Sequence, residues 1–278
     1  MTTFEIINNK NEIYIGNNLR QYIVQIKNIL EGVTEFLEGE SRKGKKLTYY
    51  KIKDNPQKYF EEINIKIELD ECKEIILQEE TKLELGGVNK QSFSIIYPLT
   101  DINLVQNNKI TVLGPEIYEI STHDIDFGMF VLLGVKKISE KIYNELLHFN
   151  FISNGIEGFM IRTIPRRFWC RISEGLINKG VSFELLGNAI AYLYKQKFED
   201  VIDVIEIFIV NSHPESVLKF IELTDEIRSS QRTRWKEKIE KWKQNIDCDY
   251  DWDCAECPYI ETCDEVREVL DEREKIEE

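Results

Sequence analysis

Residues 201–210 read VIDVIEIFIV, and this stretch decides the fold class. Its apolar, β-branched composition and its length are typical of a β-strand rather than a helix. A second apolar run, Phe127–Val135 (FGMFVLLGV), is also of strand length. Such continuous runs are typical of strands in the interior of a sheet. The first segment is therefore the clearest strand of the chain, and the second is predicted to be a central strand.

Around these two segments, strand-like and helix-like patterns alternate from about residue 61 to residue 212. The predicted strands are Ile63–Leu69, Glu74–Leu77, Phe93–Tyr97, Ile110–Leu113, Ile156–Ile161 and Arg167–Ile172, and the predicted helices are Ser139–Phe149 and Phe183–Gln196. The order lacks the regular strand–helix repeat of a doubly wound sheet. We therefore predict a mixed α/β (α+β) core over residues 61–212, with Gly86-Gly87 at a tight turn.

Two flanking regions are predicted to be separate from this core. Residues 1–60 form an N-terminal extension, with a hairpin of Phe4–Ile7 and Glu12–Ile15, an amphipathic helix over residues 19–33, and a charged linker at Glu38–Lys46. Residues 213–278 form a long helix, ending near Asn245, and a cysteine-containing tail.

The charge of the chain limits the classes of partner. Its 278 residues hold 36 Lys and Arg against 50 Asp and Glu, so the formal net charge is −14. A protein this acidic is not expected to bind nucleic acid through the phosphate backbone. The sequence shows neither the pattern of a signal peptide nor an apolar run of about 20 residues. We therefore expect a cytoplasmic protein that binds no membrane.

Four of the six cysteines lie close together near the C-terminus. Cys248, Cys254, Cys257 and Cys263 follow the pattern C-x5-C-x2-C-x5-C. Four thiolates suit a [4Fe–4S] cluster, and they also suit a tetrahedral zinc site. Disulfides or free thiols are the remaining alternative. The neighbouring aspartates would lower the reduction potential of a cluster. The other two cysteines, Cys72 and Cys170, are predicted to be small buried apolar residues.

Arginines gather around one tryptophan in the otherwise acidic chain. The arginines near Trp169 in the sequence are Arg162, Arg166, Arg167 and Arg171, and the last three are the candidate ligands. Guanidinium groups bind phosphates through paired hydrogen bonds, and an indole can stack on adenine. The alternative is a strand whose arginines form ion pairs with surface carboxylates.

Several short motifs resemble the acetyl-CoA synthase family, the beta subunit of the carbon monoxide dehydrogenase/acetyl-CoA synthase complex. The resemblance covers residues 63–235 and is carried in order by Leu83–Gly87, Val112–Glu116, Glu157–Ser173, Gly175–Asn188 and Val201–Val210. It implies the fold of the family's middle domain and a role in anaerobic one-carbon metabolism. It also implies CoA as a ligand of Trp169 and Arg171, and a corrinoid iron–sulfur protein or a carbon monoxide dehydrogenase-type subunit as partner.

The sequence departs from this family at the metal site. The family holds nickel with a Cys-Gly-Cys tripeptide, and none occurs in the 278 residues. The leading hypothesis is therefore a docking, CoA-binding or electron-transfer role without carbonyl chemistry. One alternative is an active acetyl-CoA synthase-type acyltransferase that uses the four-cysteine cluster. Another is an interaction protein that zinc stabilises and that has no redox role.

Overall fold

The computed structural model describes residues 3–69, 76–136, 142, 145–146, 155–164 and 167–243. The chain divides into two compact units, residues 1–225 and 226–278. The first unit holds two sheets, so the predicted mixed α/β class is confirmed. None of the described helices is long and apolar enough to cross a bilayer.

The larger sheet has five strands in the order β1-β4-β9-β6-β3. These strands are β1 (Leu47–Lys51), β4 (Lys109–Leu113), β9 (Ile202–Asn211), β6 (Phe127–Val135) and β3 (Ser92–Leu99). The two apolar runs pair antiparallel as β9 and β6, next to the middle of the sheet. Every residue of β6 is buried, which confirms that it is a central strand.

The smaller sheet has four strands in the order β5-β2-β8-β7. They are β5 (Asp124–Ile125), β2 (Thr81–Leu85), β8 (Arg167–Ser173) and β7 (Phe159–Ile164). Strands β2 and β8 are antiparallel, as are β7 and β8. The predicted strand over residues 167–172 is therefore confirmed, whereas the one predicted at residues 156–161 begins later, at Phe159.

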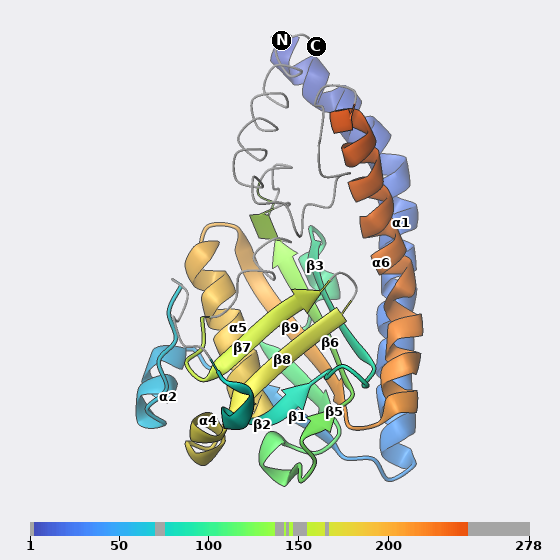
Figure 1. Ribbon diagram of the computed structural model, residues 1–278. Coiled ribbons are helices and arrows are strands. Elements are labelled where there is room, and N and C mark those ends of the chain that lie inside the picture. Colours follow the sequence, from blue (N-terminus) through green and yellow to red (C-terminus); the bar gives the residue numbers. More distant parts are fainter. Residues whose placement is uncertain are drawn as a thin grey trace. The chain divides into compact units, whose positions relative to one another are not determined.

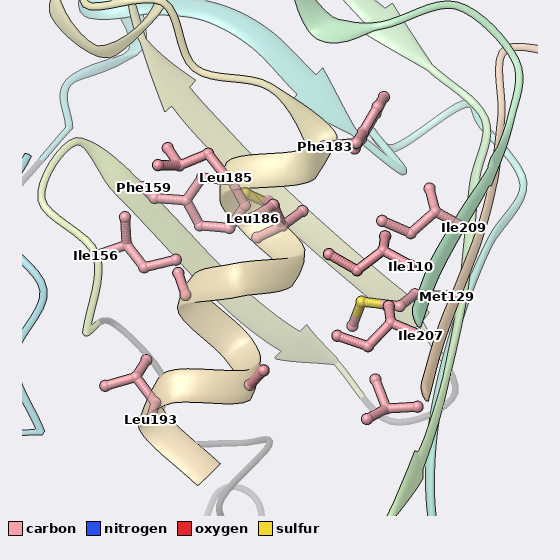
Figure 2. Close-up of a cluster of buried hydrophobic side chains, with 14 of the residues drawn as sticks. Ile110, Met129, Ile156, Phe159, Phe183, Leu185, Leu186, Leu193, Ile207 and Ile209 are labelled. Atoms are coloured by element: carbon pink, nitrogen blue, oxygen red, sulfur yellow. The ribbon is translucent and has the colours of Figure 1, made fainter. Parts of the chain in front are cut away.

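Helix α5 (Phe183–Lys197) packs between the two sheets, as Figures 1 and 2 show. It begins where the Leu185 N–H donates a hydrogen bond to Ser182 Oγ over 3.1 Å, which caps the first turn. Its apolar face meets the inner faces of both sheets, with Ile110, Ile207 and Ile209 on one side and Phe159 on the other (Figure 2). This core confirms the helix predicted from Phe183.

The opposite face of the five-stranded sheet is covered by the beginning of α6 (Pro214–Lys243). A Cβ on Gly128 of β6 would lie 3.1 Å from the ring of Phe220, so the helix approaches the strand closely there. The ring of Phe220 also meets Phe93 of β3 edge-on, with 6.3 Å between centroids. In α1 (Thr3–Arg42), Gly32 faces Leu223 of α6.

The N-terminal region differs from the sequence-based expectation. Helix α1 runs without a break from Thr3 to Arg42, so the predicted hairpin and the first half of the predicted linker are wrong. The sequence over this range contains no proline, and an isolated pair of four-residue strands would be marginally stable. Residues 47–51 then join the main sheet as β1, paired with β4.

Three further predictions lie between β1 and β7. Residues 63–69 follow helix α2 (Pro56–Glu62), which Asn55 caps. They do not form the predicted strand, because an isolated bridge between Ile67 and Ile156 is their only strand-type pairing among the described residues. Of the strand predicted at 74–77, the described residues Ile76 and Leu77 are not in a strand. Most of the helix predicted over residues 139–149 lies outside the described residues. Cys72 also lies outside them. Cys170 is fully buried, as predicted.

Candidate functional site

Glu84, Trp169 and Arg171 form a compact cluster on the outer face of the four-stranded sheet. The Trp169 indole N–H donates to Glu84 Oε2 over 3.0 Å, and Arg171 Nε donates to Glu84 Oε1 over 3.1 Å. The Arg171 guanidinium also lies 4.8 Å from the centre of the Trp169 ring. One carboxylate therefore holds a stacked guanidinium–indole pair in a fixed orientation.

Strand alternation explains why these three side chains meet. Leu83 and Leu85 of β2 point into the core, so Glu84 between them points outward. On β8, Cys170 and Ile172 point inward and Trp169 and Arg171 outward. The β2–β8 register places Glu84 directly opposite Arg171, where an opposite-charge pair stabilises the sheet.

The Gly86-Gly87 turn makes room for this cluster. Gly86 has φ +68, and an added Cβ would lie 2.3 Å from the Phe168 carbonyl oxygen. A Cβ on Gly87 would lie 3.1 Å from Glu84 Oε2. The first glycine therefore permits the backbone conformation and the close approach to β8, and the second leaves space beside the carboxylate. The predicted tight turn is confirmed.

The cluster is partly accessible to solvent. The Arg171 side chain is 19% exposed and that of Glu84 12%. In the part of the chain that the structure describes, no hydrogen-bond partner is found for the two terminal nitrogens of Arg171. The arrangement can therefore present oriented donors to a ligand, while Glu84 cancels the charge of the guanidinium.

Of the four predicted CoA ligands, the structure brings two together. Trp169 and Arg171 contact each other, whereas Arg166 lies outside the described residues and only the backbone of Arg167 is described, at the start of β8. The ion pair with Glu84 matches the alternative interpretation of the arginines. Glu84 was missed as a site residue because a sequence does not show which strands are neighbours, although it lies in the quoted Leu83–Gly87 motif.

The four candidate metal ligands, Cys248, Cys254, Cys257 and Cys263, lie outside the described residues. Their convergence on one metal centre stays a prediction. Within the described residues, no group of three or more His, Cys, Asp or Glu side chains is arranged to hold a metal ion.

Two other motifs that resemble the family form internal contacts. Glu157 Oε1 accepts a hydrogen bond from Lys179 Nζ over 3.2 Å, and a Cβ on the adjacent Gly158 would lie 2.8 Å from Ser173 Oγ. The Glu157 side chain is 42% exposed. These contacts tie the turn before β7 to the end of β8 and to α4 (Glu174–Asn178).

The Val112–Glu116 motif ends β4 and fixes the start of α5. Glu116 is 1% exposed; its Oε2 accepts the Phe183 N–H over 2.8 Å and its Oε1 accepts the Tyr50 hydroxyl over 2.5 Å. Burial, and then the hydrogen bond to Glu116, raise the pKa of the Tyr50 hydroxyl. Glu116 therefore acts as a buried helix cap, which joins β1 to α5 through the loop after β4.

Comparison with known proteins identifies relatives of the first unit. Residues 46–217 match the family model of the CO dehydrogenase/acetyl-CoA synthase complex beta subunit. The acetyl-CoA decarbonylase/synthase complex subunit beta of Methanopyrus kandleri is 29% identical over 157 residues, which cover 55% of this chain and 33% of the relative. The same subunit of Methanothermobacter thermautotrophicus is 24% identical over 155 residues, 55% of this chain and 32% of the relative.

A third relative extends the match slightly. Subunit beta 1 of the acetyl-CoA decarbonylase/synthase complex from Methanosarcina thermophila is 24% identical over 179 residues, 63% of this chain and 36% of the relative. The chain thus spans about a third of the length of each of these relatives. Because the family model covers more than half of its residues, this chain belongs to the CO dehydrogenase/acetyl-CoA synthase complex beta subunit family.

Proposed function

We propose that this chain is a binding subunit of an acetyl-CoA synthase-type complex in anaerobic one-carbon metabolism, and that it does not itself assemble acetyl-CoA. It docks a corrinoid iron–sulfur protein or a carbon monoxide dehydrogenase-type subunit and binds CoA at Trp169 and Arg171. The observation that carries this proposal is the oriented guanidinium–indole pair, which the family-like segments build on a partly exposed sheet face.

The geometry suits the phosphate and adenine groups of CoA. With Nε held by Glu84, the free terminal edge of the Arg171 guanidinium can donate two parallel hydrogen bonds to a phosphate. The exposed part of the Trp169 ring can contact an adenine. Because Glu84 neutralises Arg171, this pair orients a phosphate rather than attracting it from a distance. Arg166 and Arg167 would supply the remaining positive charge.

The four cysteines suit the proposed iron–sulfur centre by their donor chemistry. Cys248, Cys254, Cys257 and Cys263 would supply four thiolates to a [4Fe–4S] cluster, which would give the chain one-electron redox chemistry. Zinc is the alternative occupant. The 278 residues contain no Cys-Gly-Cys tripeptide, so we propose that this chain lacks the family's nickel site.

Titration calorimetry with CoA tests the ligand site. Arg171→Ala is expected to weaken CoA binding by at least about tenfold, because a hydrogen bond to a charged group contributes about 1.5–3 kcal/mol. Arg42→Ala is the control, since Arg42 forms only an exposed ion pair with Glu38 on α1. Equal CoA affinity in all three proteins, or no binding by the wild type, would refute the ligand assignment.

Glu84→Gln separates a ligand-binding role from a structural one. The amide oxygen still accepts a hydrogen bond from Arg171 or Trp169, but the countercharge is gone. If the pair binds phosphate, CoA affinity rises; if the pair only stabilises the sheet, stability falls and CoA affinity does not change. Size-exclusion chromatography with a purified corrinoid iron–sulfur protein tests the docking role.

A further inference from the structure

A hollow lies beside the four-stranded sheet, apart from the Glu84 cluster. It has a volume of about 530 Å³ and is bounded by η1 (Gln78–Glu80), β2, the segment from η3 (Ile117–Glu119) to His123, and α4. Figure 1 shows β2, β5 and α4 close together at this end of the unit. Its volume is in the range of ligand pockets, about 300–1,000 Å³.

The floor of the hollow is apolar. Leu83 and Ile117 are each 2% exposed, and Ile120 and Ile177 are partly buried against the same core. Because Leu83 and Ile117 belong to the core cluster and Ile120 and Ile177 pack against it, the floor is fixed by the packing of the fold. Leu83 and Ile117 are almost fully covered, so an occupant would meet the apolar floor mainly at Ile120 and Ile177.

The rim of the hollow is acidic. Glu79, Glu80 and Glu174 line it, against one lysine, Lys82. Lys82 Nζ lies 4.0 Å from Glu174 Oε1, and both side chains are more than half exposed, so this ion pair is weak. Glu79 has no ion-pair partner among the residues that the structure describes. The net charge of the rim is −2 (three glutamates and one lysine), which favours a cationic occupant.

Tyr118 in the lining of the hollow, and Leu77 next to η1 in the chain, favour a protein over a small cation as the occupant. Tyr118 lines the hollow and is 64% exposed, and Leu77, directly before η1, is 53% exposed. Tyrosine is enriched at the energetic centres of protein interfaces. A small cation would leave both side chains in water, whereas a peptide segment could cover them.

We propose that this hollow binds a lysine- or arginine-bearing segment of a protein partner. The aliphatic part of one basic side chain lies on Ile120, Ile177 and Tyr118, and its charged end reaches Glu79 and Glu174. The inference rests on the proposed docking function and adds the surface and the chemistry of the partner.

Fluorescence anisotropy with labelled peptides tests this proposal. In the two basic peptides lysine or arginine alternates with leucine, and in the negative control peptide glutamate replaces lysine. The double variant Glu79→Gln/Glu174→Gln is expected to weaken binding of the basic peptides about tenfold, since each partly exposed pair contributes up to about 1 kcal/mol. Lys82→Ala is expected to strengthen binding about threefold, because it removes a repulsive charge. If these residues had a purely structural role, the two variants would not change peptide affinity in opposite directions.

The control pair is closely matched. Glu31 and Lys27 on α1 lie 3.9 Å apart and are each 61% exposed, against 4.0 Å and similar exposure for Glu174 and Lys82. Glu31→Gln and Lys27→Ala are expected to leave peptide affinity unchanged. Tyr118→Ala should weaken peptide binding but not spermine binding.

The outcomes separate this inference from the proposed function. The inference is overturned if the wild type binds neither basic peptide. It is also overturned if Lys82→Ala and Glu79→Gln/Glu174→Gln do not shift peptide affinity in opposite directions, or if the small polyamine spermine binds as tightly as the peptides. Peptide binding that fails while CoA and the corrinoid protein still bind refutes only the inference. Peptide binding that persists while neither CoA nor the corrinoid protein binds refutes only the proposed function.

Discussion

Replacing Glu206 by glutamine should make the protein more stable at alkaline pH and change little at acidic pH. Glu206 lies in β9, is 2% exposed, and accepts the Gln106 N–H at Oε2 over 2.7 Å. Burial raises the pKa of this carboxyl from 4.5 to about 7, although the hydrogen bond from Gln106 and the charge of Lys109 oppose the shift. The folded protein therefore keeps a proton that the unfolded chain releases.

The sign and size of the effect follow from this difference. Between pH 4.5 and about 7 the folded state binds more protons than the unfolded state, so stability falls as pH rises through that window. Each pH unit within the window corresponds to about 1.4 kcal/mol. The cost of the carboxyl is about 1 kcal/mol at pH 5 and about 3 kcal/mol at pH 8.5. The glutamine variant does not carry this cost, so its stability relative to the wild type should grow by about 2 kcal/mol between the two pH values.

Urea-induced unfolding, followed by far-UV circular dichroism at pH 5 and pH 8.5, measures this advantage. The difference between variant and wild type removes the contributions of other titrating groups. Glu31→Gln, an exposed glutamate on α1, is the control and should show no trend. A Glu206→Gln advantage that stays constant within about 0.5 kcal/mol across the range would refute the assignment of a buried, proton-binding carboxylate.

Three further predictions concern the Gly86-Gly87 turn, the partly buried ion pairs of Glu40, and the metal. Gly86→Ala should cost more than about 2 kcal/mol in urea unfolding, because its Cβ would meet β8, whereas Gly180→Ala, at φ +84 in open space, should cost only about 1 kcal/mol. Hydrogen bonds from Lys43 and then Lys45 lower the pKa of the Glu40 carboxyl to about 2. Glu40→Gln should therefore reduce the free energy of unfolding by about 1 kcal/mol at pH 7 in urea unfolding. This loss should vanish as the pH falls from 4.5 toward 2, because the wild-type carboxyl is then protonated as well. Anaerobically prepared protein should contain about four irons per chain, and Cys257→Ala should lose them; colourless protein with one zinc would contradict the iron–sulfur proposal.

The sequence predicts the main strands well where burial alone determines the pattern. Phe127–Val135 matches β6 to the residue, and VIDVIEIFIV differs from β9 by one residue at each end. Phe127–Val135 is apolar on each face, and VIDVIEIFIV is interrupted only by Asp203 and Glu206, so few other structures suit either run. The helix from Phe183 is predicted for a similar reason, since its apolar residues recur at helical spacing and mark its buried side.

Weaker patterns failed where neighbours in space decide the structure. The strand β1 contains Thr48, Tyr49 and Tyr50 but follows a charged stretch, and only its pairing with β4 shows that it belongs to the sheet. Likewise Glu84 becomes a site residue only because β2 lies beside β8. Sequence spacing placed Trp169 and Arg171 on one face of one strand, but it could not identify the carboxylate on the next strand that fixes both.

The contacts of the motifs that resemble the family concern packing rather than ligand binding. Gly86 and Gly158 lie where a side chain would collide with β8, and Gly187 of α5 lies where a Cβ would come 2.6 Å from Ile110. Glu116 caps α5 from the loop after β4. These residues fix how the segments of this chain pack, and a shared fold does not by itself preserve a reaction. What this chain binds must instead be decided at side chains that reach the surface, and in the described residues the Arg171 face and the acidic hollow are two such places with opposite ligand chemistry.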